Sequence, residues 1–184
     1  MSLLIALAAH EIAHLFFAIL LNIKFSRVKI SLFGFNFDAN LENISYLKKI
    51  LLFFSGPACN LLLYAGIKNT EYFYFANINL FLAYINLVPI VPLDGGNICK
   101  TLMEIFLPKD TVSRYIIMTN TFFVISFITI IHIYKNYLYF LLVVMGLKGI
   151  VEENRYFLEK SIIMRYNKIK NKQSRKKWYL KIVL

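Results

Sequence analysis

The chain opens with an uncharged apolar run from Met1 to Asn22, and this run contains the sequence His10-Glu11-Ile12-Ala13-His14. Residues four apart share one face of a helix, so both imidazoles can bind a single zinc ion. The Glu11 carboxylate between them can take a proton from zinc-bound water. A run of this length is about long enough to cross a bilayer as a helix. The sequence therefore predicts a hydrolytic zinc centre inside a membrane.

The composition also favours a membrane protein. Hydrophobic residues make up 59% of the 184 residues and charged residues 17%, whereas soluble domains average roughly 45–50% and about 25%. The apolar residues form five blocks, which are Met1–Asn22, Ile50–Ile67, Tyr72–Cys99, Tyr115–Tyr134 and Asn136–Val151. All but the last approach the ~20 residues needed to cross the hydrocarbon layer. We expect a mainly α membrane protein with about five transmembrane helices.

The basic residues fall in alternate gaps between these blocks. They lie between the first and second blocks, between the third and fourth, and from Lys148 onward, whereas Lys68 and Lys135 lie in the other gaps. The positive-inside rule then places the first group in the cytoplasm. The net charge of +11 is explained by this topology, so no nucleic-acid partner is expected. We divide the chain into a protease-like core, residues 1–151, and a basic cytoplasmic tail, residues 152–184.

The tail is polar and contains neither glycine nor proline. Its cationic and aromatic residues include Lys168, Lys170, Lys172, Arg175, Lys176, Lys177, Trp178 and Tyr179. Such a segment is typical of a helix that lies on the anionic inner leaflet of the bilayer. Docking of a membrane regulatory protein is the alternative.

A catalytic zinc site needs a third protein ligand, with the fourth position left to water. Asp94 is the other acidic residue deep in an apolar block, within the stretch Asn86-Leu-Val-Pro-Ile-Val-Pro-Leu-Asp-Gly-Gly96. Pro89 and Pro92 break a helix there, and Gly95 and Gly96 allow close approach of the backbone. Irregular backbone at membrane depth is tolerated where it is buried in protein or lines a wet cavity. Asp94 can therefore reach the first helix, although an ordinary Asp-Gly turn at the membrane edge is the alternative.

A second helix breaker lies in Ser55-Gly56-Pro57-Ala58-Cys59-Asn60. Gly56 and Pro57 would let helices approach closely. Asn60 and Asn86 are then amides in apolar surroundings, and each needs a partner. They either form hydrogen bonds between helices or hold a substrate backbone or an oxyanion near the metal.

Apolar and polar residues alternate from Val28 to Asp38, with Gly34 near the middle. This pattern predicts a β-hairpin or a pair of strands. Its free edge could pair with an extended substrate segment.

Together these motifs resemble those of the site-2 protease family of intramembrane zinc metalloproteases. The H-E-x-x-H of His10–His14, the G-P-x-x-N of Gly56–Asn60 and the N-x-x-P-x-x-P-L-D-G-G of Asn86–Gly96 follow the family's order. The resemblance implies one Zn²⁺ held by His10, His14 and Asp94, with Glu11 as the catalytic base. It also implies that Val28–Asp38 is the family's membrane-associated β-element.

The stretch between His14 and Asp94 is too short for a PDZ-like insertion. In this respect the sequence is similar to the compact bacterial branch of the family that contains stage IV sporulation protein FB. In that branch, the protease cleaves the membrane-associated pro-segment of a sporulation sigma-factor precursor. The resemblance therefore implies a membrane-associated protein substrate and a bacterial cytoplasmic or forespore membrane. The sequence departs from the family in two ways. The family usually has a transmembrane helix before the H-E-x-x-H helix, whereas here the motif starts at residue 10 of the sequence. Family members also often carry a regulatory CBS region after the last span, and the 33 residues from Glu152 are too few for one.

Two other classes of protein share some of these features. A catalytically silent membrane scaffold would keep the fold and bind partners through the basic tail, but the intact Glu11 and the full ligand set argue against it. A transporter with broken helices would place its site at the bilayer midplane, but the H-E-x-x-H spacing and the lack of paired repeats in the sequence argue against that.

Overall fold

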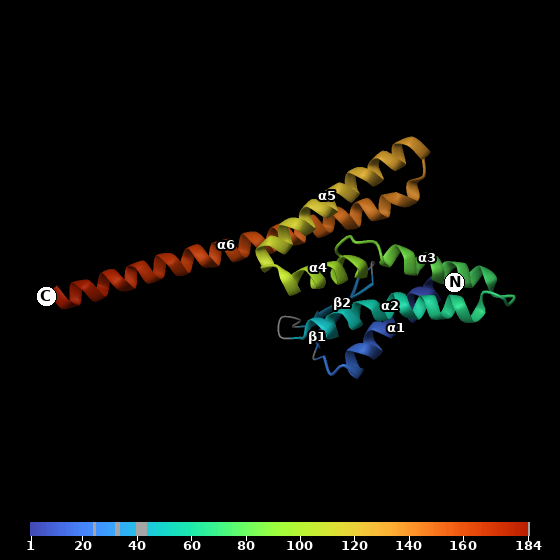
Figure 1. Cartoon of the computed structure of the whole chain (residues 1–184), viewed down its shortest axis with the longest axis horizontal. Coiled ribbons are helices and arrows are strands. Elements are labelled where there is room, and N and C mark those ends of the chain that lie inside the picture. Colours follow the sequence, from blue (N-terminus) through green and yellow to red (C-terminus); the bar gives the residue numbers. More distant parts are fainter. Residues whose placement is uncertain (24, 32–33, 40–43, 184) are drawn as a thin grey trace.

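Helices account for most of the structure. The computed structural model describes the backbone of residues 1–23, 25–31, 34–39 and 44–183, and the side chains of residues 1–23, 44–137 and 139–170. The helices are α1 (Ser2–Leu20), α2 (Tyr46–Ile67), α3 (Phe73–Asn86), α4 (Asp94–Phe106), α5 (Lys109–Tyr134), the short 3-10 helix η2 (Tyr137–Tyr139) and α6 (Phe140–Val183). The prediction of a mainly α protein is confirmed (Figure 1).

Helices α1, α2 and α5 are long and apolar enough to cross a membrane. Their outer faces carry large apolar side chains such as Leu4, Leu62 and Met118, which are 70%, 73% and 66% exposed. Faces of this kind suit contact with lipid, because water would not favour so much apolar surface. The chain is an integral membrane protein.

The predicted number of five spans differs from the three helices that meet both criteria among the described residues. The block Tyr72–Cys99 divides into α3 and α4 because the prolines in its middle lack the N–H that a helix interior needs. Neither half reaches the ~20 residues of a full span. The last block, Asn136–Val151, forms the start of α6, and charged residues from Lys148 onward interrupt its apolar stretch.

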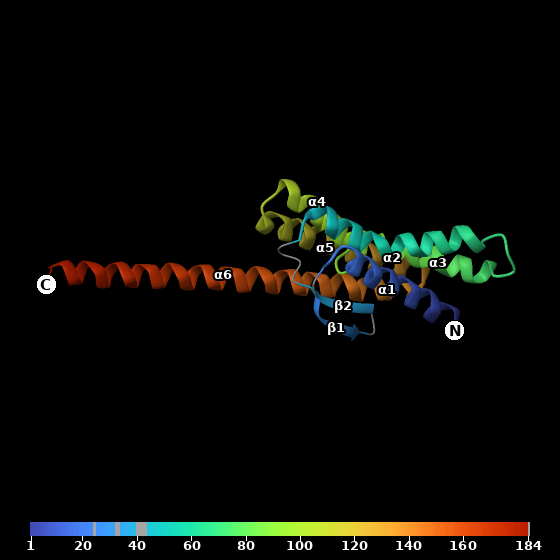
Figure 2. The same cartoon turned by 90° about the horizontal axis from the view of Figure 1, so that it is seen from below.

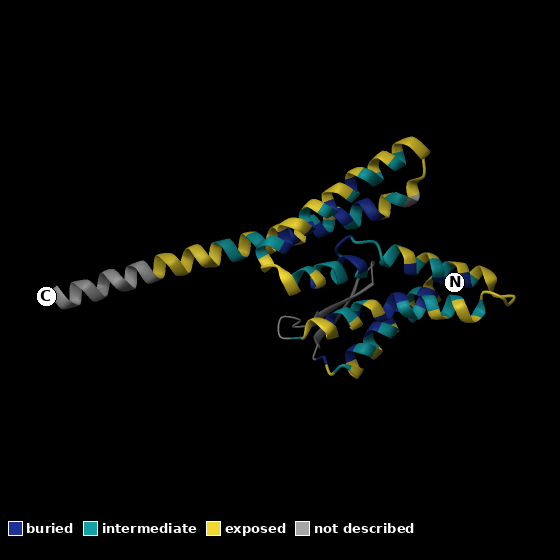
Figure 3. Cartoon of the chain, in the orientation of Figure 1, coloured by how far each residue is buried: buried dark blue, intermediate teal, exposed yellow. Residues whose placement is uncertain are grey.

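The broken pair α3 and α4 packs along α2, and α5 and α6 form an antiparallel hairpin beside it (Figures 1 and 2). The α2–α3 turn and the α5–α6 turn lie at one end of the bundle, and the α4–α5 turn lies at the other (Figure 1). Buried residues follow the faces along which the helices meet (Figure 3). The helices thus alternate in direction, as the distribution of basic residues predicts.

Helix α6 continues without a break past residue 151, the predicted boundary between core and tail, and extends well beyond the bundle (Figure 2). Lys100 of α4 donates a hydrogen bond to Glu153 of α6, and Lys160 of α6 donates one to Asp110 of α5. The contact with Asp110 raises the pKa of the Lys160 ammonium above its ordinary value. These pairs tie the first part of the predicted tail to the core.

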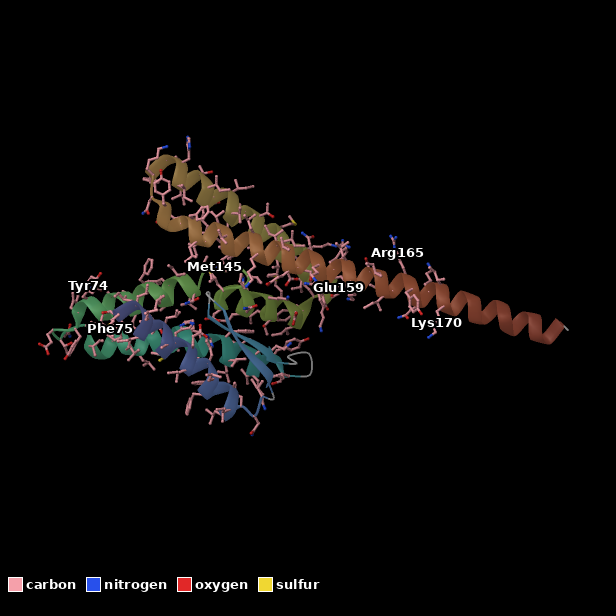
Figure 4. The ribbon with its side chains drawn as sticks, turned by 180° about the vertical axis from the view of Figure 1, so that it is seen from behind. Tyr74, Phe75, Met145, Glu159, Arg165 and Lys170 are labelled. Carbon is pink, nitrogen blue, oxygen red and sulfur yellow. The ribbon has the colours of Figure 1, made fainter. Side chains whose placement is uncertain are left out.

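Further along α6, Arg165 and Lys170 lie on the part that extends beyond the bundle (Figure 4). The side chains of the predicted tail residues Lys172, Arg175, Lys176, Lys177, Trp178 and Tyr179 lie outside the described residues.

A short hairpin follows α1. The helix ends where Asn22 adopts the left-handed conformation, with φ of 52°, and Ile23 N donates to Ala18 O at 2.9 Å, a common helix-terminating bond. Strands β1 (Phe25–Ser31) and β2 (Gly34–Ala39) then pair antiparallel, with Ser31 opposite Gly34. The stretch Val28–Asp38 lies in this pair, apart from residues 32–33, which lie outside the described residues. Strand β2 contacts α1, the helix that carries both histidines.

Candidate metal centre

The buried face of α1 carries both histidines of the first motif. Ala6, His10, His14 and Ala18 follow one another at intervals of four residues, and all four are buried. The small alanines at either end of this stripe let neighbouring helices approach closely. His10 and His14 are 3% and 6% exposed, so their rings face α2 and α3 rather than lipid.

Asp94 enters the site as the first residue of α4. The segment between α3 and α4 ends at Leu93, which has the extended conformation with φ −63° and ψ 158°. A carboxylate in the first turn of a helix is favoured by the positive end of the helix dipole. Added Cβ atoms on Gly95 and Gly96 would lie 2.2 Å from Leu87 O and 2.3 Å from Ile90 C. These two glycines therefore allow the irregular segment to fold tightly over the start of α4.

The ligand atoms of His10, His14 and Asp94 converge on one point. The His10 Nε2 and His14 Nε2 atoms are 3.2 Å apart, and they lie 3.1 and 3.3 Å from Asp94 Oδ2. Atoms bound to Zn²⁺ at ~2.0–2.1 Å in a tetrahedron are separated by about 3.3 Å. The three distances match the edges of such a tetrahedron.

Hydrogen bonding explains why these atoms suit a cation. His14 Nδ1 lies 2.8 Å from the backbone oxygen of Leu52, which can only accept, so Nδ1 carries the proton. His14 Nε2 therefore presents a lone pair toward His10 Nε2 and the Asp94 carboxylate. A bond from the second ring nitrogen to a carbonyl is the usual way in which a metal-binding histidine is oriented. The residues present fit a divalent metal such as zinc.

The second motif supplies the wall opposite the two imidazoles. A Cβ atom added to Gly56 would lie 2.4 Å from His14 Nε2 and 2.6 Å from His10 Nε2. Any side chain at this position would occupy the space in front of the ligand atoms. Gly56 therefore keeps that space open, and Pro57 is buried beside it in α2.

Glu11 is buried beside His10 on α1, at 8% exposure. It directly follows His10 in α1, the first of the two histidines whose ring nitrogens converge with Asp94. It is not one of the three residues whose ligand atoms converge.

The remaining predicted residues lie around the cluster or support its backbone. Asn86 Nδ2 donates to Leu82 O of its own helix at 3.1 Å. Asn60 is fully buried, and neither of its amide atoms has a hydrogen-bond partner among the described residues. Pro89 and Pro92 belong to the irregular segment, where Pro92 O accepts a hydrogen bond from Asn97. In the part of the chain with described side chains, the contacts of the two predicted amides do not involve the cluster.

Two side chains near the site were not predicted from the sequence. Ser55 Oγ donates to Leu52 O at 2.7 Å and lies 3.2 Å from His14 Nδ1. Asn120 of α5 contacts the irregular segment that leads to Asp94. A polar residue inside a span is costly and usually functional. Asn120 could have been found by this signal, since it is an amide within the apolar block Tyr115–Tyr134.

The sequence is similar to those of known peptidases. The sequence profile of peptidase family M50 matches residues 64–128, which include Asp94 and the segment before it. A curated zinc metalloprotease homologue of Synechocystis sp., sll0528, is 30% identical over 110 residues, which are 53% of this chain and 29% of that protein. The chain thus spans less than a third of the length of this relative.

The fold is also similar to a solved structure, the site-2 protease from Methanocaldococcus jannaschii. The two share 15% sequence identity with a TM-score of 0.65, over 85% of this chain and 76% of the other. At this level of identity the likeness concerns the fold alone.

Proposed function

We propose that this chain is an intramembrane zinc metalloendopeptidase of the site-2 protease family, which hydrolyses a peptide bond in or near the membrane segment of its substrate. The observation that carries the proposal is the convergence of His10, His14 and Asp94 at 3.1–3.3 Å beside the buried Glu11. A single Zn²⁺ bound there would activate a water molecule and polarise the substrate carbonyl.

The chain's own residues would then divide the work. His10, His14 and Asp94 hold the ion, and the carbonyl of Leu52 keeps the His14 ring in the orientation that presents Nε2. Glu11 accepts the proton of the attacking water and returns it to the leaving amine. Glu11, His10 and His14 are buried and Asp94 is partly buried, which limits the access of bulk water to the reaction.

The substrate is proposed to be a membrane-associated protein, because the site lies between helices that cross the bilayer. The three motifs and their close spacing resemble the compact bacterial branch, so we extend the proposal to a sporulation sigma-factor precursor, processed by regulated intramembrane proteolysis in the cytoplasmic or forespore membrane. The basic tail would then lie in the cytoplasm, against anionic lipid or a membrane regulatory protein. Pairing of the substrate with the β1–β2 hairpin stays a prediction.

The test compares wild type with Glu11→Gln in proteoliposomes that contain single-span membrane proteins, one of them a sigma-factor precursor with its pro-segment. We expect wild type to hold one zinc ion, to cleave, to lose cleavage with a chelator and to regain it with Zn²⁺. Glu11→Gln should keep the zinc and lose about 10²–10⁴-fold in rate, because it cannot take up the proton.

The matched control is Glu71→Gln, which changes an exposed glutamate at the α2–α3 turn and should cleave like wild type. A catalytically silent scaffold would behave alike with and without Glu11. A transporter would move a solute without new peptide termini. Either result would contradict the proposal.

A further inference from the structure

The segment that carries Asp94 is buried against helices that contribute no metal ligand. Ile90, Val91 and Leu93 are 0%, 6% and 3% exposed. Ile90 and Leu93 pack with Leu142 of α6, and Val91 packs with α5. The α5–α6 hairpin therefore forms the support on which this segment rests.

The segment is not helical, so its backbone N–H and C=O groups lack the regular hydrogen bonds of a helix and need other partners. Ile90 N and Leu93 N find local partners in Val88 O and Ile90 O. Pro92 has no N–H, and Val91 has both an N–H and a carbonyl between the two helices. In the interior of a membrane protein an unpaired backbone group costs several kcal/mol, so the partner of Val91 matters.

Asn120 is that partner. It is fully buried, and its Oδ1 accepts from Val91 N at 3.2 Å while its Nδ2 donates to Val91 O at 2.8 Å. The same Nδ2 lies 3.4 Å from Gly146 O of α6. One amide thus joins α5, α6 and the residue three positions before Asp94.

Glycine on α6 lets the helix approach this contact. A Cβ atom added to Gly149 would lie 1.9 Å from Val91 O and 2.4 Å from Asn120 Nδ2. No side chain fits there, so α6 holds the Val91 carbonyl against the Asn120 amide. The backbone of Val91 is thereby fixed from two sides.

We propose that Asn120, with Gly149 behind it, is a positioning residue of the metal centre: by holding the backbone of Val91, it places the Asp94 carboxylate opposite His10 and His14. This inference rests on the proposed role of Asp94 as a metal ligand. Asn120 itself touches neither the ligand atoms nor a substrate. Its effect should therefore appear in metal binding and pass through Asp94.

The first measurement is the zinc affinity of the full chain in detergent, determined by competition with a chelator. Asn120→Leu should lower the affinity about 10–100-fold, the usual effect of losing a residue that orients a ligand. Cobalt substituted for zinc should show altered d–d absorption bands in this variant. The matched control is Asn79→Leu, since Asn79 is equally buried but donates to Phe75 O of its own helix. The control should keep the affinity and the spectrum of wild type.

A double-mutant cycle separates positioning from a general effect on the fold. Asp94→Ala leaves the two imidazoles, and their weaker binding is measured with Co²⁺ at millimolar concentration. In that background Asn120→Leu should change the affinity by less than about twofold, because the residue through which it acts is gone. An Asp94→Ala protein that binds zinc like wild type would instead refute the proposed ligand set.

A second variant tests the same contact without removing the amide. Gly149→Ala forces a methyl group against Val91 O and should lower the zinc affinity in the same direction as Asn120→Leu. Gly66→Ala is its control, because a Cβ at Gly66 has open space around it. The positioning role is wrong if Asn120→Leu and Gly149→Ala both bind zinc like wild type, or if Asn120→Leu weakens metal binding equally with and without Asp94.

Discussion

A single backbone oxygen orients the imidazole of His14. The carbonyl of Leu52 accepts from His14 Nδ1, and Ser55 Oγ donates to the same carbonyl. Both contacts come from α2, the helix whose Gly56 lies in front of the Nε2 atoms. The glycine of the G-P-x-x-N motif therefore contributes to the site by leaving the space in front of the Nε2 atoms free of a side chain.

Gly56 leads to a prediction at this scale. Gly56→Ala should lower zinc affinity about 100-fold or more, because its methyl group would stand 2.4–2.6 Å from both Nε2 atoms and occupy the space in front of them. Loss of a residue that only orients a ligand usually lowers metal affinity about 10–100-fold. Zinc content by mass spectrometry and chelator competition would measure the loss. The same substitution at Gly66, on the same helix, should leave zinc binding intact. Full zinc occupancy in Gly56→Ala would show that the imidazoles do not face a metal at this position.

At the scale of elements, the break between α3 and α4 turns one apolar block into two short helices. Helix α3 ends at Asn86, the segment with Pro89 and Pro92 follows, and Asp94 begins α4. Helix α4 is also held to α6 near its middle, where Lys100 pairs with the buried Glu153. Glu153 is 4% exposed and its Oε2 has no hydrogen-bond partner among the described residues. The stability of the buried carboxylate therefore depends on its ion pair with Lys100.

Removing one member of this pair should destabilise the protein. Lys100→Met leaves the Glu153 carboxylate buried without its cation, and we expect a loss of about 3 kcal/mol. Thermal or denaturant unfolding in detergent would measure it. The double variant Lys100→Met/Glu153→Leu should recover most of the loss, since no charge is left unpaired.

The control for this experiment is Glu159→Gln. Glu159 pairs with Arg155 on the exposed surface of α6 at 2.9 Å, and such pairs contribute about 0–1 kcal/mol. Equal destabilisation by Glu159→Gln and Lys100→Met would mean that the buried pair has no special role in joining α4 to α6.

At the scale of the whole molecule, the turns of the bundle separate into two ends. The α2–α3 and α5–α6 turns share one end, and the long C-terminal part of α6 leaves from the other (Figure 1). Lys68 and Lys135 lie at the first end, next to the α2–α3 and α5–α6 turns, whereas Lys48 and Lys49 at the start of α2 and Lys109 at the start of α5 lie at the other end. The fold and the charge distribution thus agree on one orientation.

This orientation predicts which cysteines an impermeant reagent can reach. In intact cells, Glu71→Cys and Lys135→Cys should react with a membrane-impermeant maleimide, whereas Lys170→Cys should react only after permeabilisation. Wild type sets the background of Cys59 and Cys99, which are half-buried. Labelling of Lys170→Cys in intact cells would place the C-terminal part of α6 outside the cytoplasm.

Much of this protein follows from local patterns in its sequence. The helical period places His10 and His14 on one face, the length of the apolar runs predicts helices that cross a bilayer, and the prolines predict the break before Asp94. Each of these depends on residues close together in the chain, for which the physical rules of helices and membranes suffice. The number of full spans could not be predicted from block length alone, because a block can be as long as a span and still be divided by prolines.

Only the tertiary structure decided which distant groups meet. The distance of 3.1 Å between His10 and Asp94 joins residues 84 positions apart, and it depends on how α1 and α4 both pack on α2. The same holds for Gly56 facing both imidazoles and for Asn120 holding the backbone of Val91. Spacing along the chain cannot predict such contacts, because they arise when several helices pack at once and every buried polar group must find a partner.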